Sequence, residues 1–120
     1  KELNLTYRDL ELQANAIAAQ LQSLNLTGER ALLLYPPGLD YITAFFGCLY
    51  GGVIPIPTYP PRPNRSLSRL VAIVRNAQAK IVLTTTSAFR KIESKFTDIS
   101  ELKTLYCLKT DTIIYDIAQQ

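Results

Sequence analysis

The residues best suited to contact a ligand lie in a short segment, YPPRPNR at positions 59–65. Its two arginines, Arg62 and Arg65, can bind phosphate, a carboxylate or an acidic protein face. Proline fixes the backbone φ angle, so the three prolines make the segment stiff, and a stiff loop positions side chains well. The alternative is that these prolines only shape a crossover and that the arginines are solvated.

The segment opens a basic island, which we define as residues 59–95. The island carries eight basic and one acidic side chain, whereas residues 1–58 carry three and five, and residues 96–120 carry two and four. These add up to 13 basic and 10 acidic groups and a net charge of +3. A basic island is more often a solvated helix face than a binding face. Aromatic residues are not interleaved with the cations, so we expect no nucleic-acid partner.

Several kinds of catalysis are excluded within these residues. The chain has no histidine, which removes Ser-His-Asp and Cys-His nucleophiles and any histidine metal site. Cys48 and Cys107 lie far apart in apolar surroundings, typical of buried thiols in a reduced, cytoplasmic protein. The only adjacent glycines, Gly51 and Gly52, have no Ser, Thr or Lys beside them and are typical of a helix end. We therefore identify no catalytic residue, no metal site and no cofactor site.

The first half of the chain predicts two helices and two strands. Thr6 is a good cap for a helix whose apolar residues recur at helical spacing until Asn25. The apolar run 30–35 predicts a strand buried on both faces, followed by a Pro-Pro-Gly turn that can face a ligand. Asp40 is expected to cap a second helix, which is apolar almost all round and should be largely buried. The prolines of 53–57 (VIPIP) restrict that strand to a sheet edge or end.

The second half predicts a helix over 66–79, a strand over 80–85, a helix over 88–96 and a strand over 103–108. The alternation implies an α/β fold with a mainly parallel sheet and helices on its faces. No run of about 18 apolar residues is present, so we expect no membrane span. Apolar patterns at both ends, such as Leu3 and Leu5, suggest a partial domain over 1–120, cut at both ends.

The stretch GERALLLYPPGLDYITAFFGCLYGGVIPIPTYPPRPNRSLSRL resembles the early part of adenylate-forming enzymes. Within it, TYPPRPNRSLSRL after VIPIP resembles the fatty acyl-AMP ligases, which often accompany polyketide and nonribosomal peptide assembly lines. LTYRDLELQANAIAAQLQ is similar to their opening helix and NAQAKIVLTT to their next helix-to-strand step. The resemblance covers about Leu3 to Thr85.

This resemblance implies that a complete parent enzyme uses ATP and Mg²⁺ to convert a fatty acid to an acyl adenylate. The acyl group then passes to the phosphopantetheine thiol of an acyl carrier protein. The nucleotide-binding motifs of that family come later in its chain, so this fragment should be inactive alone. The stiff segment would form a wall of the substrate or acceptor pocket, through Tyr59, Pro60, Arg62, Asn64 and Arg65.

Two other functions stay open. The chain can be a non-catalytic α/β module for protein interaction, or a fragment of an acyl-CoA synthetase. The aromatic side chains of the second helix can line a fatty-acid tunnel, although such a stripe is more often core; they are Tyr41, Phe45, Phe46 and Tyr50. We also expect the fragment to self-associate through exposed strand edges.

Overall fold

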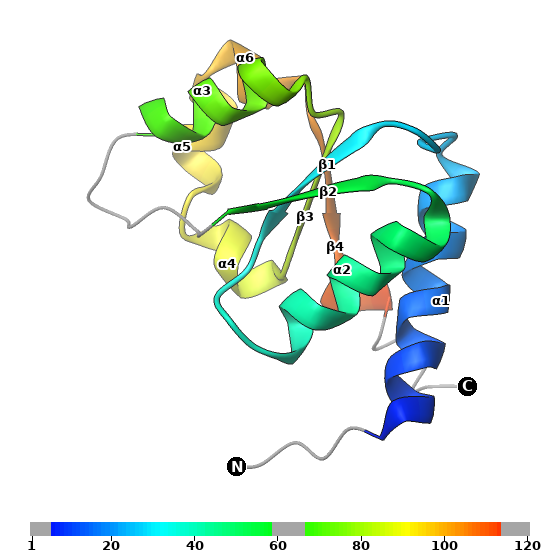
Figure 1. Ribbon diagram of the computed structural model, residues 1–120. Coiled ribbons are helices and arrows are strands. Elements are labelled where there is room, and N and C mark those ends of the chain that lie inside the picture. The colour runs from blue at the N-terminus through cyan, green and yellow to red at the C-terminus, as the bar shows by residue number, and fades with distance from the viewer. Residues whose placement is uncertain (1–5, 59–66, 114–120) are drawn as a thin grey trace.

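The computed structural model describes residues 6–58 and 67–113, which form a four-stranded parallel sheet with helices on both faces (Figure 1). The strand order is β2-β1-β3-β4 and every neighbouring pair is parallel, which confirms the predicted fold class. The strands are β1 (Arg30–Leu34), β2 (Ile54–Thr58), β3 (Ile81–Thr84) and β4 (Tyr106–Lys109). The helices are α1 (Tyr7–Ser23), α2 (Leu39–Gly51), α3 (Ser68–Ala77), α4 (Thr86–Arg90), α5 (Glu93–Asp98) and α6 (Ser100–Lys103).

Strand β2 lies at the edge of the sheet, as its prolines predicted. The backbone N–H of Ile54 donates to the carbonyl of Glu29, 2.9 Å away, so residue 54 hydrogen-bonds toward β1. Because the direction of these groups alternates along a strand, Pro55 and Pro57 turn toward the open side of the sheet. In the described sheet, the two residues of β2 that lack an N–H donor are therefore those whose backbone groups face the open edge.

Alternate residues of the strands build two cores, one on each face. We call the side covered by α1 and α2 the hairpin face; Leu33 and Leu83 point into its core, with Ile17 of α1 and Cys48 of α2. We call the other side the segmented face, because α3 and the short helices α5 and α6 cover it. Its core holds side chains from the strands and these helices, namely Leu32, Leu34, Val82, Leu70, Val74, Phe96 and Leu102.

The two long helices of the hairpin face begin differently. The Thr6 hydroxyl accepts a hydrogen bond from the Asp9 N–H at 3.1 Å, so Thr6 caps α1 as predicted. The prediction for Asp40 was wrong, because α2 begins two residues earlier, after Gly38, and Asp40 lies inside its first turn. The carboxylate of Asp40 interacts favourably there with the positive end of the helix dipole, but its side chain caps no backbone N–H. Gly52, with φ of 74°, ends α2 as predicted.

Helices α1 and α2 pack closely because α2 has glycines where they meet. A Cβ atom added at Gly47 would lie 2.7 Å from Cγ2 and 2.8 Å from Cβ of Ile17. One added at Gly51 would lie 3.3 Å from the backbone of Ala18. The pair 47 and 51 shares one side of the helix at i, i+4 spacing. Gly51 is therefore a packing residue as well as part of the helix end.

The expectation that α2 would be largely buried was wrong. Its inner side is buried, but Phe46, Leu49 and Tyr50 are 37%, 50% and 49% exposed. The apolar outer side therefore faces away from the sheet. Of the four aromatic residues proposed for a tunnel, Tyr41 and Phe45 pack partly against the core of the hairpin face.

The single helix predicted over 88–96 is divided into α4 and α5. Ile92 separates them because it leaves helical geometry at φ of −121° and buries its side chain in the core of the segmented face. Helix α6 was not predicted; it holds the buried Leu102 and is joined to α3 by an ion pair between Arg75 and Glu101. In the described part of the chain, no helix is long and apolar enough to cross a bilayer.

Candidate functional site

A polar layer lies at the carboxyl ends of β1, β3 and β4, where ligands bind in open α/β sheets. The layer contains Tyr35, directly after β1, Thr84 at the end of β3, and Thr110, directly after β4. All three side chains are at most 2% exposed. Tyr35 is the first residue of the Pro-Pro-Gly turn, so the structure places the start of that turn at the binding edge, as expected.

Hydrogen bonds join these three side chains into one chain. The Thr84 hydroxyl donates to the Leu34 carbonyl at 2.8 Å, and the Thr110 hydroxyl donates to the Thr84 carbonyl at 3.4 Å. The Tyr35 hydroxyl lies 2.7 Å from the Thr110 oxygen, and since that group already donates to Thr84, Tyr35 is the donor. Burial raises the pKa of Tyr35 far above its usual range, although the Thr110 hydrogen bond opposes this. Tyr35 therefore stays protonated and acts as a structural donor.

An acidic rim lies outside this layer. Asp111 accepts two hydrogen bonds on one carboxylate oxygen, from the Thr86 N–H at 3.1 Å and the Thr86 hydroxyl at 3.2 Å. Thr85 caps α4 by accepting from the Ala88 N–H at 3.2 Å. Partial burial, and then the charge of Asp111, raise the pKa of Asp40. The negative charge of Asp111 thus disfavours ionisation of Asp40 at this edge of the sheet.

The described residues contain neither a cluster of metal-ligating side chains nor a glycine-rich phosphate loop. No group of three or more His, Cys, Asp or Glu side chains gathers anywhere in ranges 6–58 and 67–113. Gly51 and Gly52 end a helix instead of forming a phosphate loop. Burial raises the pKa of Cys48 to about 12 and that of Cys107 to about 11, so both thiols are poor nucleophiles. We derive no reaction step through these residues.

The segment proposed as a pocket wall lies outside the described residues; it contained Tyr59, Pro60, Arg62, Asn64 and Arg65. It directly follows Thr58, the last residue of β2. Because all four strands are parallel, Thr58 stands at the same sheet edge as Tyr35 and Thr84. The last described residue before the segment therefore lies at the binding edge.

Sequence reasoning missed Thr84, Thr86, Thr110 and Asp111. A signal was present, because polar residues directly follow two apolar strands in IVLTTTS and YCLKTD. It became specific only when β4 was found beside β3, with Thr84 opposite Lys109 in the register.

Comparison with known proteins gives a consistent result. The profile of the family described as AMP-binding enzyme matches residues 1–119. The medium-chain-fatty-acid–[acyl-carrier-protein] ligase JamA of Moorena producens is 43% identical over 125 residues, covering 100% of this chain and 21% of JamA. Disco-interacting protein 2 of Drosophila melanogaster is 38% identical, over 76% of this chain and 5% of that protein.

A solved structure shows the same arrangement. The fatty acyl-adenylate ligase from L. pneumophila, in complex with acyl adenylate and pyrophosphate, superposes with a TM-score of 0.80 at 37% identity. The match covers 94% of this chain and 19% of that structure. The chain thus spans about a fifth or less of the length of these proteins.

Proposed function

The chain belongs to the AMP-binding enzyme family, and from this premise we propose that it is part of a fatty-acid-activating ligase. The complete protein joins a fatty acid to the α-phosphate of ATP, with Mg²⁺, and passes the acyl group to an acyl-carrier-protein thiol in the cytoplasm. The observation that carries this proposal is the 43% identity to JamA along the whole chain. Within the complete protein that contains this chain, residues 1–120 form part of the N-terminal AMP-binding domain.

The chain itself supplies structure to this reaction. Its sheet edge carries buried hydroxyls whose hydrogen bonds are directed at one another, so they hold the strand ends in place. Its described residues contain no cluster of three or more metal-ligating side chains, and the adjacent glycines Gly51 and Gly52 end a helix instead of forming a phosphate loop. We therefore expect the 120-residue chain neither to hydrolyse ATP nor to bind it tightly. Micromolar ATP affinity by calorimetry would contradict this expectation.

The test of the main proposal uses the longer protein that contains this chain. Fatty-acid-dependent exchange of pyrophosphate into ATP should be observed, followed by acyl transfer to a phosphopantetheine-bearing carrier protein. Exchange driven by amino acids and not by fatty acids would reject the substrate class. Transfer to coenzyme A in preference to the carrier would favour the acyl-CoA synthetase alternative.

We propose further that Tyr59, Pro60, Arg62, Asn64 and Arg65 form a wall of the acceptor pocket. The support is the three prolines of the segment and the position of Thr58, the residue directly before it, at the binding edge. In the longer protein, the double substitution Arg62→Ala and Arg65→Ala should change the ratio of carrier loading to acyl-CoA formation. The matched control removes two exposed charges of the same island, Arg69 and Lys91. An unchanged ratio in the first variant would reject the wall.

A second candidate is a non-catalytic module for protein interaction. It is favoured by the similarity to Disco-interacting protein 2, which is named for an interaction and not for a ligase reaction. The two candidates differ in one simple observation. The gene region after Gln120 should encode a Ser/Thr/Gly-rich loop ending in Pro-Lys if the ligase proposal is correct, and its absence would favour the module.

A further inference from the structure

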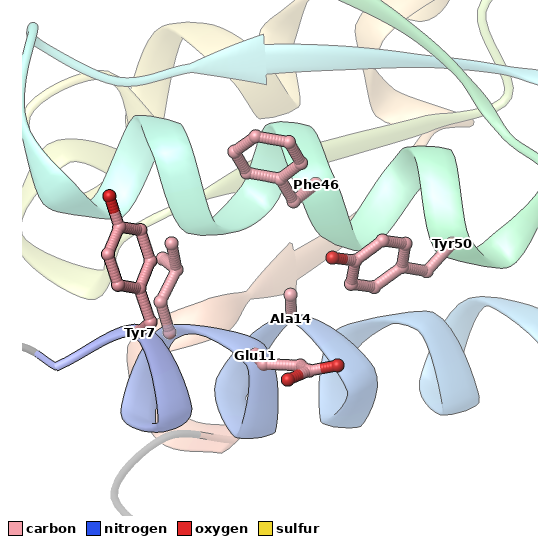
Figure 2. Close-up of a pocket in the computed structure, with 6 residues that line it drawn as sticks. Tyr7, Glu11, Ala14, Phe46 and Tyr50 are labelled. Atoms are coloured by element: carbon pink, nitrogen blue, oxygen red, sulfur yellow. The ribbon is translucent and has the colours of Figure 1, made fainter.

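A shallow hollow of about 280 Å³ lies between α1 and α2, on the side of these helices that faces away from the sheet (Figure 2). Figure 2 shows the rings of Tyr7 and Tyr50 on opposite sides of the hollow, with Phe46 above and Ala14 and Glu11 below. The residues that line it are Tyr7, Leu10, Glu11, Ala14, Phe46 and Tyr50. The hollow is thus built from three aromatic rings, small apolar groups and one carboxylate.

The lining residues come together because of helical spacing. Tyr7, Glu11 and Ala14 follow one another at i, i+4 and i+7 on α1, and Phe46 and Tyr50 are four apart on α2. The rings of Phe46 and Tyr50 have centroids 6.3 Å apart. The glycines Gly47 and Gly51 bring the two helices close enough for side chains of both to enclose one space.

The polar groups of the hollow can all accept a hydrogen bond from a cationic group. Glu11 forms no ion pair or hydrogen bond with any described residue, and neither do the hydroxyls of Tyr7 and Tyr50. No lysine or arginine lines the hollow. Aromatic faces carry partial negative charge and attract ammonium and guanidinium groups. Rings beside a carboxylate that has no partner among the described residues therefore match an organic cation. An anion would be repelled, and an acyl chain would remove water from Glu11 without replacing its hydrogen bonds.

An apolar ridge borders the hollow on the same side of α2. We define it as Leu39, Ile42 and Leu49, which are 39%, 39% and 50% exposed. With Phe46 and Tyr50, the ridge makes α2 apolar on its outer side over most of its length. A contiguous exposed apolar surface next to polar groups is typical of protein interaction sites.

We propose that the hollow binds an arginine or lysine side chain of a partner protein, and that apolar residues beside this cation pack on the ridge. A free small cation would keep most of its water in so shallow a hollow, whereas a cation carried on a polypeptide also gains the contact with the ridge. The charge of the hollow selects the basic residue, and the ridge selects its apolar neighbours. The proposal is independent of the ligase reaction, because it uses none of the residues at the carboxyl edge of the sheet.

The test uses the full 120-residue chain and two peptides, acetyl-Leu-Gly-Arg-Gly-Leu-amide and its citrulline analogue. Citrulline has the shape of arginine but no charge. NMR titration with the arginine peptide should give saturable shifts in the ring signals of Tyr7, Phe46 and Tyr50. The citrulline peptide should bind at least about threefold more weakly, as expected for the loss of a cation–π contact and an exposed ion pair.

Two variants check the contributing groups. Tyr7 is 92% exposed, so Tyr7→Leu removes a wall of the hollow without disturbing the fold. Tyr7→Leu and Glu11→Gln should each weaken binding of the arginine peptide about twofold to fivefold. The matched controls are Tyr106→Leu on the edge strand β4 and Glu93→Gln on α5. Both should leave the affinity unchanged.

Three results would overturn the proposal. The first is the absence of saturable shifts at α1 and α2, and the second is equal binding of both peptides. The third is a set of Tyr7, Phe46 and Tyr50 ring shifts that depends on protein concentration without peptide while the signals of the β4 edge stay unchanged, because this would mean that a second copy of the chain occupies the hollow.

Discussion

The two faces of the sheet are covered in different ways. On the hairpin face, a 17-residue and a 13-residue helix pack against each other through glycines, and their apolar surface continues to the outside. On the segmented face, helices of 10, 6 and 4 residues each bury one or two large side chains and leave a polar exterior. Both faces cover the same strands, but most of the exposed large apolar side chains among the described residues lie on the helices of the hairpin face.

The difference shows where stability and binding are separated. A short helix forms little structure alone, so α5 and α6 depend on the side chains that they bury. The long helices of the hairpin face depend instead on close backbone approach at Gly47, which leaves the larger side chains of α2 free to point outward. Substitutions on each face should therefore act by different mechanisms, and the following predictions test this in order of decreasing effect.

The largest effect is expected for Leu102→Ala on the segmented face. Leu102 is fully buried and anchors α6, so its removal leaves a cavity and should lower the free energy of unfolding by about 2 to 5 kcal/mol. Urea denaturation followed by circular dichroism measures this change. Leu12→Ala, at a position 53% exposed on α1, serves as the control and should change little. Equal losses in both variants would mean that α6 is not anchored as described.

On the hairpin face, Gly47→Ala should lower the free energy of unfolding by about 1 to 3 kcal/mol through overpacking against Ile17. The loss should be smaller in an Ile17→Ala background, because the clashing atoms are gone. Gly51→Ala, where the added atom meets its neighbour at 3.3 Å, should cost less, since alanine also favours a helix. A stabilised Gly47→Ala protein would contradict close approach of the helices.

A smaller effect is expected at the carboxyl edge, which both faces share. Tyr35→Phe removes the buried hydrogen bond to Thr110 and should cost about 1 kcal/mol in thermal or urea unfolding. Tyr41→Phe is the matched control, because its hydroxyl has no hydrogen bond to a described residue. If both substitutions cost the same, the hydroxyl chain at the edge contributes nothing measurable.

The smallest effect concerns pH. Burial and the charge of Asp111 raise the pKa of Asp40, so the folded chain holds this proton more tightly than the unfolded chain. The stability that this group contributes is present below the unfolded pKa and is lost as pH rises through the folded pKa. Asp40→Asn should therefore raise Tm at pH 7, and the corresponding gain in the free energy of unfolding should be less than about 1 kcal/mol. Near about pH 3 the substitution should have no such effect. In an Asp111→Asn background the gain should shrink; a gain of the same size would exclude Asp111 as a cause.

Features of this fold that depend on local chemistry were predictable. The prolines at 55 and 57 indicated an edge strand, and Thr6 indicated a helix start, because each acts through its own backbone or the next turn. The break at Ile92 was not predictable, since it depends on a core that forms only after α3 and β3 have packed. The start of α2 was missed for a simpler reason: Gly38 and Asp40 are both acceptable at a helix start.

The site was predictable only in part. The turn after β1 indicated the binding edge, whereas the pocket wall at residues 59–65 stays a prediction. The layer of hydroxyls required knowing that β4 lies beside β3, which joins residues 26 positions apart in the sequence. The hollow on α1 and α2 required knowing that the aromatic residues of α2 face outward, which their hydrophobicity had argued against.

The prolines of β2 determine at which edge of the sheet a further strand can pair. A strand added beside β2 would find no donors at Pro55 and Pro57, whereas β4 (YCLK) carries no proline and can supply its full set. Further strands, from the same polypeptide or from another molecule, should therefore join on the β4 side alone. The two prolines thus prevent extension of the sheet at the β2 edge, so that strands are added only at the β4 edge.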